Sequence, residues 1–237
     1  MNPTHAAPIA EPLRDQDLLD VLHHDSAVYP TDSPLSLEVL ADWIQAAPQF
    51  AFRFQARSGQ RYDEPSSAPA MGLFVAVALT TDAWRSFIAG NLREADLHTE
   101  ALFPALSHHE TSAVREYALH VYHIHKTAAW DAATSARMGP TVKAELLRRV
   151  AELEACGDRL VGVSGLAVTD AGIALMANVF ECVLLEGVVD EVVVENARHL
   201  DTDRKVVSTA EGDRLLALDE DWRVVSRPQM MVRHGSL

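Results

Sequence analysis

The sequence has few cysteines and few basic residues. Its two cysteines, Cys156 and Cys182, are too few for a disulfide framework. Only 20 lysines and arginines stand against 34 aspartates and glutamates, which gives a formal net charge of −14. A charge of this sign repels the phosphates of nucleic acids and the surface of anionic membranes. We therefore expect neither a nucleic acid nor a membrane among the partners of this protein.

Long apolar runs are also missing. The most apolar stretches, "GLFVAVALTT" at residues 72–81 and "CVLLEGVVDEVVV" at residues 182–194, are short or interrupted by acidic residues. A membrane-spanning helix needs about 20 apolar residues in succession. The first residues, "MNPTHAAPIAEPLRDQD", lack the basic and apolar regions of a signal peptide. We expect no transmembrane segment and a location in the reducing cytoplasm.

Apolar residues nevertheless make up 48% of the chain, which is enough for the core of a sizeable domain. Their spacing predicts helices over residues 15–29, 35–47, 82–91, 139–157 and 169–180. The same analysis predicts strands over residues 51–55, 72–81, 115–126 and 158–168, and two more that meet near Gly187. Thr169 is the expected N-cap of one helix, and Asp15 or Asp17 that of another.

This order of elements predicts one α/β domain over residues 1–200. Residues 1–9 are expected to be a polar tail, and residues 56–71, rich in turn-forming residues, a surface loop. Residues 201–237 are expected to be an extension that forms strands or an arm over a partner subunit in a homodimer.

Three histidines lie close together in "HVYHIHK", residues 120–126. Side chains of a regular strand alternate between its two faces. The expected first face carries Leu119, Val121, His123 and His125, and the second carries His120, Tyr122 and Ile124. The three histidines are therefore not expected to converge.

A His-x-His pair on a strand suits Zn²⁺ if a third ligand approaches. His108, His109 and Glu110 are candidates for that third ligand, but nothing in the sequence fixes one of them. The sequence also has no Cys-x-x-Cys or His-Glu-x-x-His motif. We predict no metal site.

Ser164 lies in "GVSG", residues 162–165, which is one residue short of the nucleophile motif G-x-S-x-G. We interpret Ser164 as a small residue in a tightly packed strand. The neighbouring glycines allow a ligand to approach the backbone closely.

From about residue 10 to 195 the order of elements resembles the acyl-CoA N-acyltransferase fold of the GNAT superfamily. The segment "DRLVGVSGLAVTDAGIALMANVF", residues 158–180, resembles the family's strand and helix that end in a Gly–Phe pair, with Val179 in place of the glycine. The resemblance implies an α/β fold of the α+β type, with a mixed, mostly antiparallel central sheet flanked by helices. It also implies that the fourth strand splays from the fifth.

In this family, a loop with the pattern R/Q-x-x-G-x-G/A wraps the coenzyme A pyrophosphate at the start of the long helix. Backbone N–H groups and the helix dipole bind phosphate there. The corresponding stretch is "TSARMGPT", residues 134–141, in which Gly139 fills the first glycine position, Ala136 stands where Arg or Gln belongs, and Pro140 removes one N–H donor. The resemblance implies that coenzyme A is bound by Val121, Tyr122, Ile124, Arg137, Gly139, Thr141 and Asn178.

The resemblance implies an N-acyltransferase that moves an acyl group, such as acetyl, from coenzyme A to an amine of a small molecule or peptide. Acetyl-CoA would then be the cosubstrate, and His123, His125 and Glu94 are the candidate catalytic residues, because a general base must take a proton from the amine. The negative charge of the chain suits a cationic acceptor. The alternative is a GNAT-shaped binding or regulatory protein that has lost catalysis, which the divergent loop favours.

Overall fold

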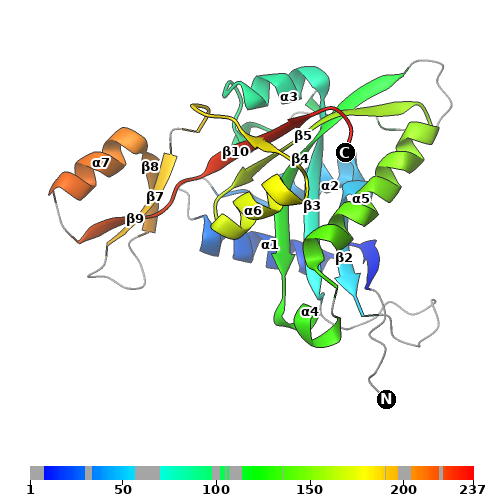
Figure 1. Cartoon of the computed structure of the whole chain (residues 1–237), viewed down its shortest axis with the longest axis horizontal. Helices are drawn as coiled ribbons and strands as arrows, with labels where there is room; N and C mark the ends of the chain where they lie inside the picture. Colours follow the sequence, from blue (N-terminus) through cyan, green and yellow to red (C-terminus); the bar gives the residue numbers. More distant parts are fainter. Residues whose placement is uncertain are drawn as a thin grey trace.

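The computed structural model describes residues 8–29, 34–56, 70–97, 102–104, 106, 114–134, 136–189, 191–196, 204–218 and 221–237. A seven-stranded sheet has the order β1-β2-β3-β4-β5-β10-β6, and a three-stranded sheet has the order β8-β7-β9 (Figure 1). The strands of the main sheet are β1 (Ile9–Pro12), β2 (Ala51–Gln55), β3 (Gly72–Thr80), β4 (Arg115–Lys126), β5 (Asp158–Ala167), β6 (Val183–Leu184) and β10 (Gln229–His234). Its helices are α1 (Asp15–Val28), α2 (Leu37–Ala46), α3 (Thr81–Ile88), α4 (Ala128–Ala133), α5 (Met138–Ala155) and α6 (Asp170–Asn178), with short 3-10 turns η1 (Pro48–Phe50) and η2 (Glu94–Asp96).

Every neighbouring pair in the main sheet is antiparallel except β4 and β5, which are parallel. Parallel neighbours require a long crossover connection, and here α4 and α5 supply it. The predicted fold class, a mixed and mostly antiparallel sheet flanked by helices, is confirmed.

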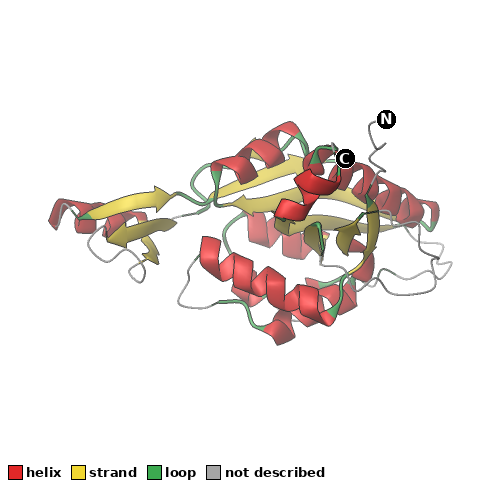
Figure 2. Ribbon diagram, turned by 90° about the horizontal axis from the view of Figure 1, so that it is seen from below, coloured by secondary structure: helices red, strands yellow, loops and turns green. Residues whose placement is uncertain are grey.

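Helices cover both faces of the main sheet (Figure 2). On one face, α1, α2 and α3 contribute core residues that include Val21, Leu40 and Trp84. On the other face, α4, α5 and α6 contribute residues that include Trp130 and Leu146. The central strand β3 is buried on both faces, which explains why its sequence is an almost unbroken apolar run.

Local signals in the sequence explain where several helices begin and end. Thr169 accepts a hydrogen bond from the backbone N–H of Gly172 at 3.1 Å, which confirms it as the N-cap of α6. The expectation for α1 was wrong, because its N-cap is Arg14. Asp17 lies in the first turn instead, where it is buried and paired with Arg53 at 3.0 Å between Nη1 and Oδ1. This buried pair ties α1 to β2.

The C-terminal part of the chain is arranged differently from the expected extension. Strand β10 lies in the main sheet between β5 and β6, although it belongs to the segment 201–237 that we expected to extend beyond the domain. The small sheet is built from β7 (Glu191–Asn196), β8 (Arg204–Ser208) and β9 (Trp222–Ser226), with α7 (Thr209–Leu218) packed on it. These elements form a lobe beside the main sheet (Figure 1), inserted in the chain between β6 and β10. Strands β6 and β10 are neighbours in the main sheet, but the lobe separates them in the sequence and β6 has only two residues. The sequence therefore did not predict that they pair.

Two predicted segments fall partly outside the described residues. Of the polar tail, residues 1–7 lie outside them, and Ile9 belongs to β1. Of the surface loop, residues 57–69 lie outside them, and Ala70 and Met71 are buried. No helix in the described ranges is both long and apolar enough to cross a membrane.

Gly162 on β5 allows an unusually close approach of Trp84 from α3. A Cβ atom at residue 162 would lie 2.2 Å from Cη2 of the Trp84 indole. We expect Gly162→Ala to lower the free energy of unfolding by about 1–3 kcal/mol through overpacking. Urea denaturation of the purified variant measures this change.

A double-mutant cycle checks the cause of that loss. Trp84→Phe removes the indole atoms that the new methyl group would meet, so the double variant should lose less stability than the sum of the two single losses. Strict additivity would contradict the packing explanation.

Candidate functional site

The two parallel strands of the main sheet part in the middle of the sheet. β4 and β5 pair from Arg115–Asp158 to Val121–Gly165 and not beyond. After this point β4 continues along β3 to Lys126, while β5 continues along β10 to Ala167. The edges of the two strands therefore face each other across a gap, as the family resemblance predicts.

The chain has the acyl-CoA N-acyltransferase fold. The order of its main sheet, the one parallel pair and the splay of that pair carry this assignment. The assignment concerns the fold alone.

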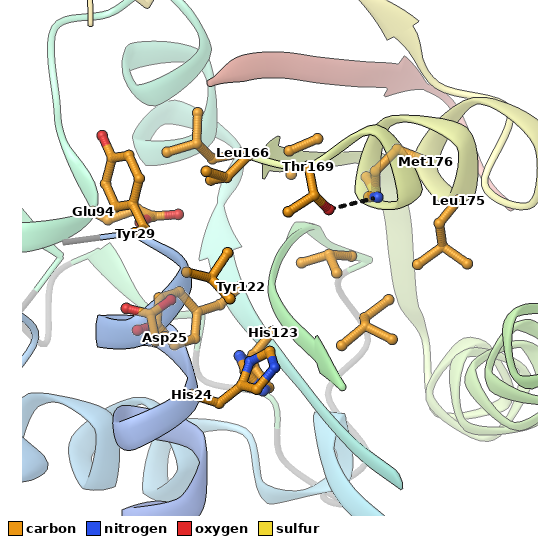
Figure 3. Close-up of a pocket in the computed structure, with 17 residues that line it drawn as sticks. His24, Asp25, Tyr29, Glu94, Tyr122, His123, Leu166, Thr169, Leu175 and Met176 are labelled. Atoms are coloured by element: carbon orange, nitrogen blue, oxygen red, sulfur yellow. Dashed lines mark hydrogen bonds between the residues drawn. The ribbon is translucent and has the colours of Figure 1, made fainter. Parts of the chain in front are cut away.

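A pocket with a volume of about 160 Å³ lies where the strands part (Figure 3). Acidic and aromatic side chains form one wall, and Leu175 and Met176 of α6 lie opposite them. The full lining consists of His24, Asp25, Val28, Tyr29, Glu94, Val121, Tyr122, His123, Ile124, Gly165, Leu166, Ala167, Val168, Thr169, Gly172, Leu175 and Met176. Backbone edges from two strands and side chains from three helical elements thus meet at one place.

A β-bulge in β4 changes which side chains share a face. Val121 pairs with Ala76 and His123 pairs with Val75, so Tyr122 is the extra residue. His120, His123 and His125 pair with Val77, Val75 and Leu73, which all belong to the core beneath α1, α2 and α3. The expected separation of the histidines was wrong, because strict alternation holds only in a strand without a bulge. Ile124 instead packs against the opposite core, with Val121.

The predicted coenzyme A residues fall into two groups. Val121, Tyr122 and Ile124 line the pocket, and Arg137, Gly139, Thr141 and Asn178 lie outside its lining. Gly139 is buried in the first turn of α5, where a Cβ atom would lie 2.7 Å from Cδ1 of Leu175 on α6. The start of the long helix is therefore packed closely against α6. A role of these seven residues in binding coenzyme A stays a prediction.

Trp130 holds the connection between β4 and α5. Its indole N–H donates to the carbonyl oxygen of Ala136 at 2.7 Å, and the ring packs edge-on against Phe54 at 5.3 Å between centroids. The Ala136 N–H donates to Oγ1 of Thr134 at 3.1 Å. Trp130 is buried at the end of the sheet and is not part of the pocket lining, so it leaves the gap between β4 and β5 open.

Two carboxyl groups and a phenol form the acidic wall of the pocket. Burial raises the pKa of Asp25 to about 6, and the nearby Glu94 carboxylate adds to this rise while hydrogen bonding with Tyr122 opposes it. Burial and the negative charges of Asp25 and Glu94 raise the pKa of Tyr122 well above its ordinary value. Tyr122 therefore stays a phenol at neutral pH, and the wall carries negative charge.

Glu94 is held by a buried histidine. Its Oε1 atom lies 2.7 Å from Nε2 of His120, whose side chain is fully buried, while the Glu94 side chain is 20% exposed. Glu94 thus reaches the pocket from η2 with one oxygen engaged.

His24, His123 and His125 form a cluster at the other end of this wall. The ring centroid of His24 lies 5.2 Å from that of His123 and 3.7 Å from that of His125. Burial and the two neighbouring imidazoles lower the pKa of His123 to about 3, and burial also lowers the pKa values of His24 and His125. All three rings are therefore neutral at pH 7. The buried Nε2 atom of His123 has no hydrogen-bond partner within the described part of the chain.

Among the residues that the structure describes, no group of three or more His, Cys, Asp or Glu side chains is arranged to hold a metal ion. The possible third ligands His108, His109 and Glu110 lie outside those residues.

The polar and aromatic residues at the end of α1 were not predicted to belong to the site. His24, Asp25 and Tyr29 lie at the end of α1, and we interpreted that helix only through its apolar side chains. The run "HHD" at residues 23–25 was the available signal, because polar residues gather there at the end of an amphipathic pattern. Their distance along the chain from β4 hid the connection.

Solved structures with a similar chain path include NAA60 of Arabidopsis thaliana in complex with a bisubstrate analogue, with 11% identity, 97% of this chain and 100% of that chain covered, and a TM-score of 0.46. Ard1 of Thermoplasma volcanium shares 8% identity over 98% of this chain and 100% of that chain, with a TM-score of 0.43. The GphF GNAT-like decarboxylase in complex with isobutyryl-CoA shares 12% identity over 96% of this chain and 98% of that chain, with a TM-score of 0.42. Similarities this low say nothing about activity. No family profile and no curated protein matches the sequence.

The raised pKa of Asp25 predicts a pH-dependent loss of stability. The pKa of Asp25 is about 6 in the folded chain and 3.8 for an ordinary aspartate, so between these pH values the folded state binds more protons than the unfolded state. The contribution of Asp25 to the free energy of unfolding is therefore fully present below pH 4. It falls by on the order of 3 kcal/mol as the pH rises through 6.

Urea denaturation at pH 4 and pH 7 measures this loss against Asp25→Asn, which has no charge to bury. The difference in unfolding free energy between variant and wild type should grow in favour of Asp25→Asn as the pH rises. A constant difference across this range would show that Asp25 does not titrate in the fold.

Proposed function

We propose that this protein transfers an acyl group, such as acetyl, from coenzyme A to an amine of a small molecule or peptide. The observation that carries the proposal is the pocket at the parting of β4 and β5, which has an anchored carboxylate in its wall. The separated strand edges offer backbone hydrogen-bonding groups to the amides of the pantetheine arm. The acidic wall offers a proton acceptor to an amine.

The reaction needs a base because an amine is an ammonium ion at neutral pH. In the proposed mechanism, Glu94 accepts one proton from the ammonium, and the freed nitrogen attacks the carbonyl carbon of the thioester. The C–N bond forms, the C–S bond breaks, and the departing thiolate takes up a proton. The products are the amide, free coenzyme A and one proton released to solvent.

Glu94 is a better candidate base than His123 because its carboxylate reaches the pocket with one oxygen held by His120. With a pKa of about 3, His123 holds a proton too weakly to take one from an ammonium ion efficiently. In this proposal His123 and His125 serve as neutral hydrogen-bonding groups in the wall. The alternative, in which His123 or His125 is the base, stays a prediction, and the rate of thiol release by His123→Gln tests it.

The acceptor is proposed to be cationic. Asp25 and Glu94 both line the pocket, and the chain has a net charge of −14. Both features attract an ammonium ion, whether it belongs to a polyamine or to a lysine side chain. A homodimer and a cytoplasmic location stay predictions.

The phosphates of coenzyme A have fewer expected partners than in the family pattern. Met138 and Gly139 offer N–H groups in the first turn of α5, Pro140 offers none, and Arg137 is exposed at the N-cap. Arg137 would supply the positive charge for the pyrophosphate.

A second candidate function is a binding or regulatory protein without catalysis. It is favoured by the contact of Gly139 with Leu175 and Val179, because α6 lies against the helix start where the family holds pyrophosphate. The two candidates differ in whether acetyl-CoA binds and is consumed.

Isothermal titration with acetyl-CoA, and with coenzyme A for comparison, tests the proposal first. We expect micromolar binding, about −8 kcal/mol, and release of free thiol when spermidine or a lysine-containing peptide is added. No heat and no thermal stabilisation at millimolar acetyl-CoA would refute the acyltransferase and favour the binding protein.

Glu94→Gln tests the proposed base. We expect the rate of thiol release at saturating acetyl-CoA to fall by roughly 10²- to 10⁴-fold, the usual contribution of a general base. The affinity for acetyl-CoA should change little, because only the acceptor side of the pocket is altered.

Glu152→Gln is the matched control, since Glu152 lies on the exposed face of α5, is paired with Arg148 and is not part of the pocket lining. Equal rates for Glu94→Gln and the control would remove Glu94 from the mechanism.

A further inference from the structure

Glu94 stands at the end of a chain of buried hydrogen bonds that runs along one face of the main sheet, beneath α3. The Trp84 indole nitrogen lies 3.0 Å from Oγ of Ser164, which lies 3.1 Å from Nδ1 of His120. Nε2 of His120 lies 2.7 Å from Oε1 of Glu94. The four side chains come from α3, β5, β4 and η2.

The chemistry of the groups gives this chain a direction. An indole N–H only donates, so the Ser164 oxygen accepts from Trp84 and has its own hydrogen available for His120. A carboxylate oxygen only accepts, so Nε2 of His120 carries a proton towards Glu94. A ring with its proton on Nδ1 alone would set the lone pair of Nε2 against the Glu94 carboxylate. These donors therefore point towards the pocket.

Burial makes this arrangement rigid. His120 and Ser164 are completely buried, and Trp84 is 2% exposed. The ring of Phe87 packs edge-on against His120 at 4.5 Å between centroids. Removing the partner of a polar group buried at such depth destabilises the folded state. The four groups therefore hold one another in place.

The same geometry excludes Ser164 as a nucleophile. Ser164, His120 and Glu94 do form a series of hydrogen-bonded groups. The Ser164 hydroxyl, however, is fully buried beneath Trp84, and only Glu94, at the other end, reaches the pocket. The series is thus oriented towards the carboxylate.

We propose that Trp84, Ser164 and His120 are positioning residues that fix the Glu94 carboxylate for the acceptor amine. One carboxylate oxygen is committed to His120, and the other is left to receive the proton of a substrate ammonium. The inference rests on the proposed acyl transfer, but the hydrogen-bond chain itself can be tested without activity.

The first test is spectroscopic and uses the wild-type protein. Long-range ¹H–¹⁵N correlation spectra of protein labelled in its histidines distinguish the two tautomers and the imidazolium. We expect Nε2 of His120 to carry a proton, with assignment through loss of the signals in His120→Gln. A proton on Nδ1 alone would overturn the proposal whether or not the protein is an acyltransferase.

The second test compares His120→Gln with His120→Asn. The glutamine amide can place an N–H near the former Nε2 atom and keep a donor for Glu94, whereas the shorter asparagine reaches only the former Nδ1 position. We expect the rate at saturating acetyl-CoA to be roughly 10- to 100-fold higher for His120→Gln, the range that hydrogen bonds to charged groups supply. The KM for acetyl-CoA should be the same in both variants.

Thermal melts of both variants show whether they fold. Folded variants of equal rate would overturn the positioning role while leaving acyl transfer intact. Failure of wild type to bind acetyl-CoA would refute the acyl transfer instead, and the tautomer of His120 would then decide the hydrogen-bond chain alone.

Discussion

The end of the pairing between β4 and β5 is the constraint on which the pocket depends. Gly165 lies at the last paired position, where a Cβ atom would lie 3.2 Å from the carbonyl oxygen of Val121 and 2.7 Å from Cε of Met176. The absence of a side chain lets β5, β4 and α6 meet at one point. Beyond it each strand stays with its antiparallel neighbour, so the two edges diverge and their backbone groups face the pocket instead of each other. A parallel pair can part in this way because a long crossover, not a tight turn, joins its strands.

Charge in the pocket opposes the stability of the fold. Asp25, Glu94 and Tyr122 are brought together at partly buried positions, and the pKa values of Asp25 and Tyr122 rise as a result. A core built for stability alone would place apolar or paired groups there, as it does with Arg53 and Asp17. Groups that are held in an unfavourable electrostatic environment cluster at functional sites. The pocket wall has this character.

Most of the main sheet could be predicted from the sequence because its signals are local. The apolar run of β3, the helical spacing of α5 and the cap at Thr169 each depend on residues close together in the chain. The bulge at Tyr122 could not be predicted, because it is set by the register against β3 and not by the residues of β4 alone. Nor could the place of β10, since the small lobe separates it from β6, its neighbour in the sheet. Both missed features shape the site. The bulge places His120, His123 and His125 on one face of β4, and β10 pairs with the edge of β5 that faces away from β4.

The candidate site was only half visible in the sequence for the same reason. Glu94 and the residues of β4 were singled out, but Trp84 and Ser164 are separated by 80 positions, and His120 and Ser164 by 44. Ser164 was correctly interpreted as a small residue in a packed strand, but its hydroxyl also makes hydrogen bonds there. A buried hydroxyl that only filled space would carry an unmet hydrogen-bonding cost, and alanine or glycine would fill the same space without it. The presence of serine at this depth is therefore best explained by the two groups on either side of it, the Trp84 indole N–H that donates to its oxygen and Nδ1 of His120.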